Sequence, residues 1–142
     1  MSIRPAPAIL ALFLSIPYTT ALAQQDGPKA VVAVVGDADR FTIGQEDFCG
    51  KRTEIDSPSG KQFRIPSNKR TFFYIQSRIH GNMLTYTCEG DFSFVPDPGM
   101  LHIIRYSMAD NHCKLEVFES EPGGKPVPAA VQREESQNCL FK

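Results

Sequence analysis

Three histidines, His80, His102 and His112, are the side chains of this 142-residue chain best suited to moving protons. Nucleophilic catalysis also needs a Ser or Cys beside such a base, and an acid that orients it. His80 and His112 fall in predicted turns, His102 falls at an inward-facing strand position, and the sequence has no G-x-S-x-G motif. We therefore expect His102 to be a semi-buried structural residue. A small hydrolase built around His102 is the alternative.

Four cysteines, Cys49, Cys88, Cys113 and Cys139, could bind a metal or form disulfides. Zinc motifs usually place two ligands two to four residues apart, whereas these cysteines are separated by 39, 25 and 26 positions. An even number of widely spaced cysteines in a small exported domain is typical of disulfides. We therefore expect two disulfides, no metal and no cofactor.

The pairing of the cysteines has three possible forms. Cys88 and Cys113 fall on the inward faces of their predicted strands, and a disulfide needs Cα atoms within about 7 Å of each other. Two strands that flank a shared neighbour in a flat sheet lie roughly 10 Å apart, so this bond requires a bent sheet or two facing sheets. We favour Cys88–Cys113 with Cys49–Cys139. The alternative is Cys49–Cys88 with Cys113–Cys139.

Positive charge is concentrated between residues 51 and 78, where seven Lys and Arg residues stand against two acidic ones. The predicted face for an anionic partner, a polymer or a protein, consists of Arg64, Lys69, Arg70 and Arg78. Alternatively, this is a solvated face whose charges are balanced by the acidic strands of the fold. The formal net charge of −1 argues against a nucleic-acid binder.

The N-terminus has the pattern of a secretory signal peptide. A positive segment (residues 1–4) precedes an apolar stretch (residues 8–16), and Ala21-Leu22-Ala23 matches an A-x-A cleavage site. The apolar stretch is too short for a bilayer, which takes about 20 residues, and no later segment is long enough either. We expect cleavage after Ala23 and a periplasmic or secreted mature chain of residues 24–142. A retained N-terminal anchor helix is the alternative.

Alternation of apolar and polar residues predicts the strands that must position these side chains. Strands are expected at residues 30–35, 41–43, 61–65, 72–79, 83–95, 100–109 and 113–119. The last three, joined by short turns, should form an antiparallel meander. Residues 44–48 should form a helical turn or a loop, and the Pro- and Gly-rich residues 121–128 should be irregular. Residues 131–137 should form a short strand or a helical turn.

The same alternation gives successive strands an apolar inner face and a polar outer face. This pattern predicts an all-β, antiparallel sandwich or barrel in a single domain of residues 24–142. A sandwich is favoured, because a single sheet would leave a large face of Phe and Ile residues uncovered.

One stretch of the chain carries a family resemblance. Cys88, then Phe94-x-Pro96-x-x-Gly99, a strand, and Cys113-x-x-x-Val117 resembles small exported β-sandwich proteins of proteobacteria, mostly of unknown function. The resemblance covers residues 61–119. Those proteins commonly carry an aromatic residue, often Tyr, three positions after the glycine, where this chain has His102. The resemblance implies an immunoglobulin- or transthyretin-like sandwich and transfers no catalytic or binding residues.

The sequence as a whole therefore predicts an exported, non-catalytic binding or accessory protein of the bacterial envelope or extracellular space. Inhibition of an extracellular hydrolase is an alternative, with Val95–Met100 or Glu121–Pro128 as the loop that enters the enzyme.

Overall fold

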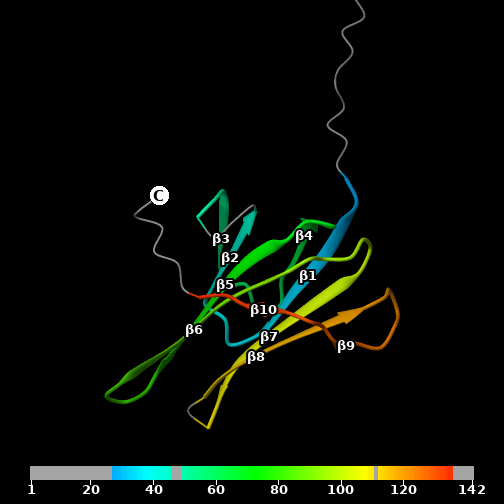
Figure 1. The fold of residues 1–142 in the computed structure, drawn as a ribbon. Coiled ribbons are helices and arrows are strands. Elements are labelled where there is room, and N and C mark those ends of the chain that lie inside the picture. Colours follow the sequence, from blue (N-terminus) through cyan, green and yellow to red (C-terminus); the bar gives the residue numbers. More distant parts are fainter. Residues whose placement is uncertain (1–26, 46–48, 111, 136–142) are drawn as a thin grey trace, which may run out of the picture.

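The computed structural model describes residues 27–45, 49–110 and 112–135, and within these ranges the protein is all-β (Figure 1). Its strands are β1 (Lys29–Gly36), β2 (Arg40–Gln45), β3 (Arg52–Asp56), β4 (Gln62–Pro66), β5 (Thr71–His80), β6 (Thr85–Phe94), β7 (Leu101–Ala109), β8 (His112–Ser120), β9 (Val127–Pro128) and β10 (Gln132–Arg133). The described part of the chain has no helix long and apolar enough to cross a membrane. The predicted signal peptide, residues 1–23, lies outside the described residues.

The strands form two five-stranded sheets. Sheet A has the order β4-β1-β7-β8-β9, and sheet B has the order β10-β6-β5-β2-β3. Alternation buries one face of each sheet, as in β1, where Ala30, Val32 and Val34 are fully buried. These side chains and those of sheet B belong to one apolar core. The predicted all-β, sandwich-like architecture is therefore confirmed.

Stacked phenylalanines form the centre of this core. The ring centroid of Phe73 in β5 lies 5.6 Å from that of Phe41, 5.2 Å from that of Phe92 and 4.8 Å from that of Phe94. Such offset aromatic pairs stabilise a core beyond the area that they bury, by about 0.5–1.5 kcal/mol each. Phe73, Phe92 and Phe94 thus lie on the inner face that alternation predicts, whereas Leu84 and Tyr86, which the same alternation predicts to face inward, are exposed.

The predicted antiparallel meander over residues 83–119 is wrong for its first strand, β6. β6 pairs with β5 in sheet B, from Thr71↔Phe94 to His80↔Thr85, whereas β7 lies in sheet A between β1 and β8. β7 runs parallel to β1, with Val31 opposite Leu101, so the sandwich is not purely antiparallel. The chain changes sheets in the turn after β6, and alternation of side chains carries no information about that change.

Several edge elements also differ from the expectation. β3 was not predicted, because it is exposed except for the half-buried Ile55 and so lacks an apolar pattern. β9 lies in the segment predicted to be irregular, at the edge of sheet A, where a proline is tolerated. Gln132 and Arg133 form β10, which confirms the strand alternative for that segment. Gly44 and Gln45 extend β2, and residues 46–48 lie outside the described residues.

A disulfide between Cys88 of β6 and Cys113 of β8 joins the two sheets. Its Cα atoms lie 5.6 Å apart, within the limit of about 7 Å for a disulfide. The two strands come this close because they belong to facing sheets. The predicted Cys88–Cys113 pairing is confirmed, and the alternative Cys49–Cys88 pairing is excluded. Cys49 is not a free thiol either. Its predicted partner Cys139 lies outside the described residues, so the Cys49–Cys139 pairing stays a prediction.

Candidate ligand groove

A groove of about 370 Å³ opens at one edge of the sandwich, between β4 of sheet A and β2 and β3 of sheet B. Its apolar lining consists of Ile43, Ile55, Phe63 and Ile65. These side chains belong to the core or pack against it, and the ring of Phe63 lies 6.1 Å from that of Phe41, centroid to centroid. The groove is therefore a place where the apolar interior reaches the surface between the edge strands β3 and β4, which belong to different sheets.

A second cavity of about 280 Å³ continues this groove at its basic end. It is lined by Gln45, Pro66, Lys69, Arg70 and Thr71, and it shares Gln45 and Pro66 with the first cavity. Together the two cavities have the size range and the mixture of apolar walls and few polar groups that are typical of small-molecule sites.

The turn between β4 and β5 positions the two cations at this end. Asn68 adopts a left-handed backbone (φ 59°), which asparagine tolerates, and its N–H donates to the carbonyl of Pro96 over 2.8 Å. The Nη1 of Arg70 donates to the Oγ of Ser93 (2.8 Å) and to the Oε1 of Gln132 (3.1 Å). Arg70 is thus held against sheet B, with further N–H groups able to meet a ligand.

The four predicted partner-binding residues do not form one face. Lys69 and Arg70 come together in the extension, whereas Arg64 belongs to the adjoining groove, at a strand position that alternates with the inward-facing Phe63 and Ile65. Arg78 lines instead a separate cavity of about 150 Å³, together with Asp39, Arg40, Asp56 and Gln76. Arg40 lines the same cavity, so two cations stand beside two carboxylates there, and the balancing acids are not those of the acidic strands that the alternative named.

The outer face of sheet B is acidic around Tyr74. Tyr74 lies opposite Asp91, and the Nε2 of the neighbouring Gln76 donates to the Oε1 of Glu89 over 2.7 Å. Burial and the charge of Glu89, which also accepts a hydrogen bond from Tyr74, raise the pKa of Tyr74 to about 12. Burial and Glu89 likewise raise the pKa of Asp91. An anionic partner is therefore not expected on this face.

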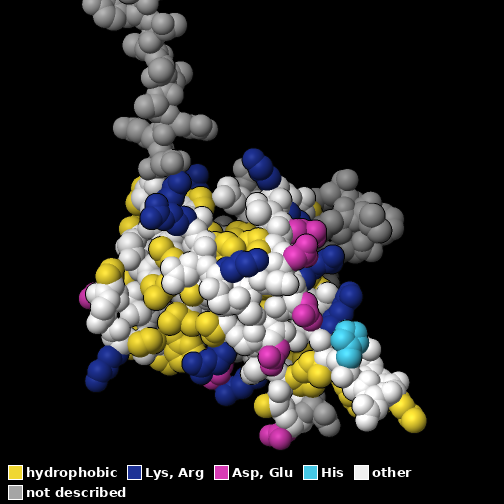
Figure 2. All heavy atoms as spheres, turned by 180° about the vertical axis from the view of Figure 1, so that it is seen from behind, with side chains coloured by type: hydrophobic (Ala, Val, Ile, Leu, Met, Phe, Trp, Pro, Cys, Tyr) yellow, Lys and Arg dark blue, Asp and Glu magenta, His cyan; other side chains and the backbone are white. Residues whose placement is uncertain are grey.

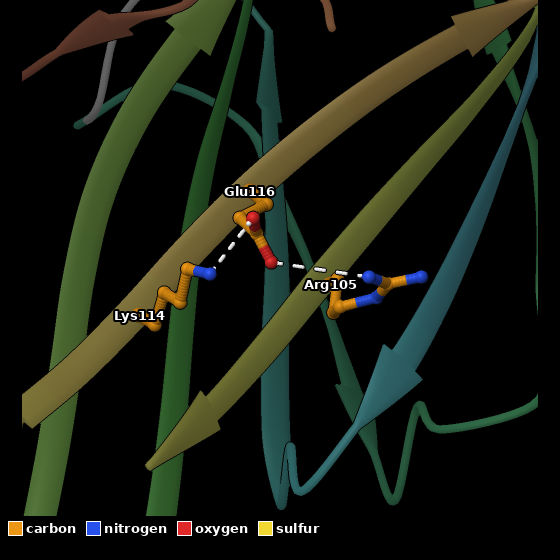
Figure 3. A network of polar contacts seen from close by, with 3 residues as sticks. All are labelled: Arg105, Lys114 and Glu116. Atoms are coloured by element: carbon orange, nitrogen blue, oxygen red, sulfur yellow. Dashed lines mark ion pairs between the residues drawn. The ribbon is translucent and has the colours of Figure 1, made fainter. Parts of the chain in front are cut away.

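The outer face of sheet A is mostly apolar and half-buried. Lys114 pairs with Glu116 (Nζ–Oε1 3.0 Å), and Arg105 lies 3.9 Å from the other oxygen of Glu116 (Figure 3). The guanidinium of Arg105 also lies over the ring of Phe118, 5.3 Å from its centroid. Hydrophobic side chains reach the surface beside Lys and Arg side chains on the side of the molecule seen in Figure 2. Arg105 and Lys114 are thus paired with a carboxylate of their own sheet.

His102 lies inside the core. It is 1% exposed, and neither of its ring nitrogens has a hydrogen-bond partner among the described residues. Burial lowers the pKa of His102, against the opposing charges of Glu119 and Asp97. The residue is more buried than predicted, and this arrangement does not expose a base to a substrate.

The two loops considered for enzyme inhibition differ in how they are held. Residues 95–100 are tied to the body by backbone hydrogen bonds from Gly99 to Lys29 (3.0 Å) and from Val31 to Met100 (3.0 Å). Residues 121–128 are exposed and carry a Gly124-to-Glu121 backbone hydrogen bond. Neither arrangement points to a particular enzyme, and inhibition stays a prediction.

Comparisons of the chain with protein-family models, curated proteins and solved structures find no match. The resemblance to small exported proteobacterial proteins therefore stays a prediction. The described residues also contain no group of three or more His, Cys, Asp or Glu residues placed to hold a metal ion.

The sequence patterns identified the cations of the groove but did not identify its apolar lining, which is called the apolar floor below. Ile43, Ile55 and Phe63 are partly buried although they lie on or next to edge strands. The available signal was the placement of large apolar residues in short strands that also carry charges, as in Arg52–Asp56 and Gln62–Pro66. That signal does not show which two strands face each other across an opening.

Proposed function

We propose that this protein is an exported, non-catalytic binding protein whose groove takes an elongated ligand with an apolar body and an anionic group. One observation carries this proposal: the apolar floor around Phe63 is continuous with the cavity that Lys69 and Arg70 line. An apolar chain or ring would displace water from the floor, and the anion would gain charge-assisted hydrogen bonds at the basic end.

The charge of the basic end supports an anionic ligand over a neutral one. Lys69 and Arg70 are exposed, and Arg64 lines the apolar part of the groove. The acidic residues Glu89 and Asp91 lie on the outer face of sheet B, away from the opening between β3 and β4. The charged side chains among the described residues that line this cavity are Lys69 and Arg70, so a carboxylate, phosphate or sulfonate at Arg70 would meet two cations.

Export is supported by the signal-peptide pattern of residues 1–23 and by the Cys88–Cys113 disulfide, since disulfides persist in oxidising compartments. The proposal therefore includes a periplasmic or secreted location. It also includes an immunoglobulin- or transthyretin-like sandwich and a second disulfide, Cys49–Cys139.

A matched pair of fluorescent probes tests the groove. 1-Anilinonaphthalene-8-sulfonate carries an anion, and N-phenyl-1-naphthylamine has the same aromatic framework without it. We expect saturable binding of the sulfonate and weaker binding of the neutral probe. Thr53→Trp places a large side chain at an exposed position of the groove wall and should weaken both probes about tenfold. Lys69→Gln should weaken only the sulfonate, by about threefold to tenfold, because it removes one charge.

Lys125→Gln is the matched control, because Lys125 is an exposed cation in the loop between β8 and β9. It should change neither affinity. The proposal is wrong if Thr53→Trp leaves both affinities unchanged. Equal affinities for the two probes, with no effect of Lys69→Gln, would remove the anionic part of the proposal.

A further inference from the structure

The β5–β6 hairpin extends beyond the body of the sandwich (Figure 1). β2 pairs with β5 only as far as Gln76, and β10 pairs with β6 only at Phe92 and Ser93. Residues 78–87, called here the apex ribbon, therefore form two strands that have no third strand beside them among the described residues. Isolated two-stranded hairpins are marginal in water, so this extension is not explained by the stability of the fold.

The end of the apex ribbon is apolar. Met83 is 96% exposed, Leu84 64% and Tyr86 45%, and Tyr86 lies opposite the half-buried Ile79. Large apolar side chains gathered at one exposed place mark a site of interaction. Here they lie at the turn and beside it, rather than along one face of the ribbon. Apolar side chains placed around the end of a hairpin can all be covered if the end enters an apolar medium. A flat partner surface would contact only some of them.

The apex ribbon is held in place for such an interaction. The N–H of Gly81 donates to the carbonyl of Leu84 over 2.8 Å and closes the turn. The Nδ1 of His80 lies 3.1 Å from the Oγ1 of Thr85. At the base, the Cys88–Cys113 disulfide ties the ribbon to β8. The apolar end is therefore presented in a defined position.

We propose that the apex ribbon inserts shallowly into the surface of a lipid bilayer. No Asp or Glu occurs between Ser77 and Cys88, so insertion buries no carboxylate of the ribbon. Tyr86, next to the apolar end, is of the type that favours the interface between lipid and water. Residues 81–84 lie outside the strands, and peptide groups without a ladder restrict the depth of insertion because they must stay hydrated. This proposal uses a different surface from the groove and does not depend on the proposed ligand.

The absence of tryptophan from the sequence allows a direct test. In Met83→Trp, the single indole reports on the apex alone. Vesicles of phosphatidylethanolamine and phosphatidylglycerol should shift its emission to the blue and protect it from acrylamide quenching. Val127→Trp is the matched control, since Val127 is 51% exposed on β9, away from the hairpin (Figure 1). Its emission should not change.

Sedimentation with the same vesicles provides a second measurement. The Met83→Ser/Leu84→Ser variant should reduce the vesicle-bound fraction at least tenfold, with an unchanged far-UV circular dichroism spectrum because both side chains are exposed. No blue shift for Met83→Trp, or equal sedimentation of the double variant, overturns the proposal. A shift with a purified envelope protein but not with vesicles assigns the apex to a protein partner and also overturns it. Thr53→Trp blocks the groove and should sediment normally, which separates this proposal from the ligand site.

Discussion

The imidazole ring of His102 lies 4.9 Å from the ring of Phe94, centroid to centroid, and is tilted by 40° to it. His102 belongs to sheet A and Phe94 to sheet B, so this contact crosses the core of the sandwich. Neither ring nitrogen has a described hydrogen-bond partner, and burial lowers the pKa of His102. The folded protein therefore favours the neutral imidazole, because a buried imidazolium would lose its hydration without gaining a partner.

This contact predicts that the protein loses stability in mild acid. The unfolded chain binds a proton at His102 below about pH 6.5, whereas the folded chain resists protonation. The free energy of unfolding should therefore fall as the pH decreases below about 6.5. His102→Phe should reduce this fall, which urea denaturation at pH 7.5 and pH 5 measures. His112→Gln, at an exposed position, is the control. Identical pH dependence in His102→Phe and the parent would contradict the prediction.

The Cys88–Cys113 disulfide predicts a large loss of stability on its removal. It closes a loop with a sequence separation of 25 residues, for which the chain-entropy model gives about 3 kcal/mol. Cys88→Ala/Cys113→Ala should therefore lower the free energy of unfolding by about 3 kcal/mol in urea. A loss below about 1 kcal/mol would show that the bond does not restrain the unfolded chain as expected.

Adding a reductant to the double variant tests whether the protein contains a second disulfide. Reductant should destabilise the double variant further, because Cys49 is also not a free thiol. Mass mapping of proteolytic peptides from the double variant should find Cys49 linked to Cys139.

The fold was predictable where side chains alternate over long strands. Phe73 and Ile75 of β5 and Phe92 of β6 could be assigned to the core from spacing alone. The inward positions of Cys88 and Cys113 identified the disulfide, although Cys113 itself is exposed. The choice of sheet for each strand was not predictable, because alternation distinguishes the two faces of a strand and not its neighbours.

The same limit applies to the site. Lys69 and Arg70 were found together because they are neighbours in sequence and line one cavity, and Arg64 lines the groove that adjoins it. Arg78 shared their charge and an outward position, but it lies on sheet B beside Asp39, whereas Arg64 lies on sheet A. Only the packing of one sheet on the other separates these two surfaces.

Gly36 and Gly60 form a matched pair for testing the contact between β1 and β7. Both have positive φ angles, 101° and 77°. A Cβ at Gly36 would lie 2.0 Å from the carbonyl oxygen of Tyr106, whereas one at Gly60 would meet nothing within 4 Å. Gly60→Ala should cost about 1–2 kcal/mol for the backbone conformation alone. Gly36→Ala should cost clearly more in urea denaturation, or prevent folding. Equal effects would contradict the close approach of the two strands.

The contact between Tyr74 and Glu89 predicts that Tyr74 loses its proton at a higher pH than an ordinary tyrosine. Burial and the charges of Glu89 and Asp91 disfavour the phenolate and raise the pKa of Tyr74 to about 12. Since the folded pKa lies above the ordinary value of 10.0, the associated stability is present below pH 10 and is lost as the pH rises toward 12. Burial also raises the pKa of Tyr106. Ultraviolet absorbance titration should therefore show late ionisation of both tyrosines, and Tyr74→Phe should remove the part that belongs to Tyr74.

Glu89→Gln should lower the pKa of Tyr74 without restoring it fully, because burial is the larger cause of the shift. Glu54→Gln is the matched control, since Glu54 lies on β3 of the same sheet and is separated from Tyr74 by Thr42 of β2. It removes the same charge and should leave the late step unchanged. If Glu54→Gln shifted the titration as much as Glu89→Gln, the cause would be the general charge of the face and not the contact between the phenol and Glu89.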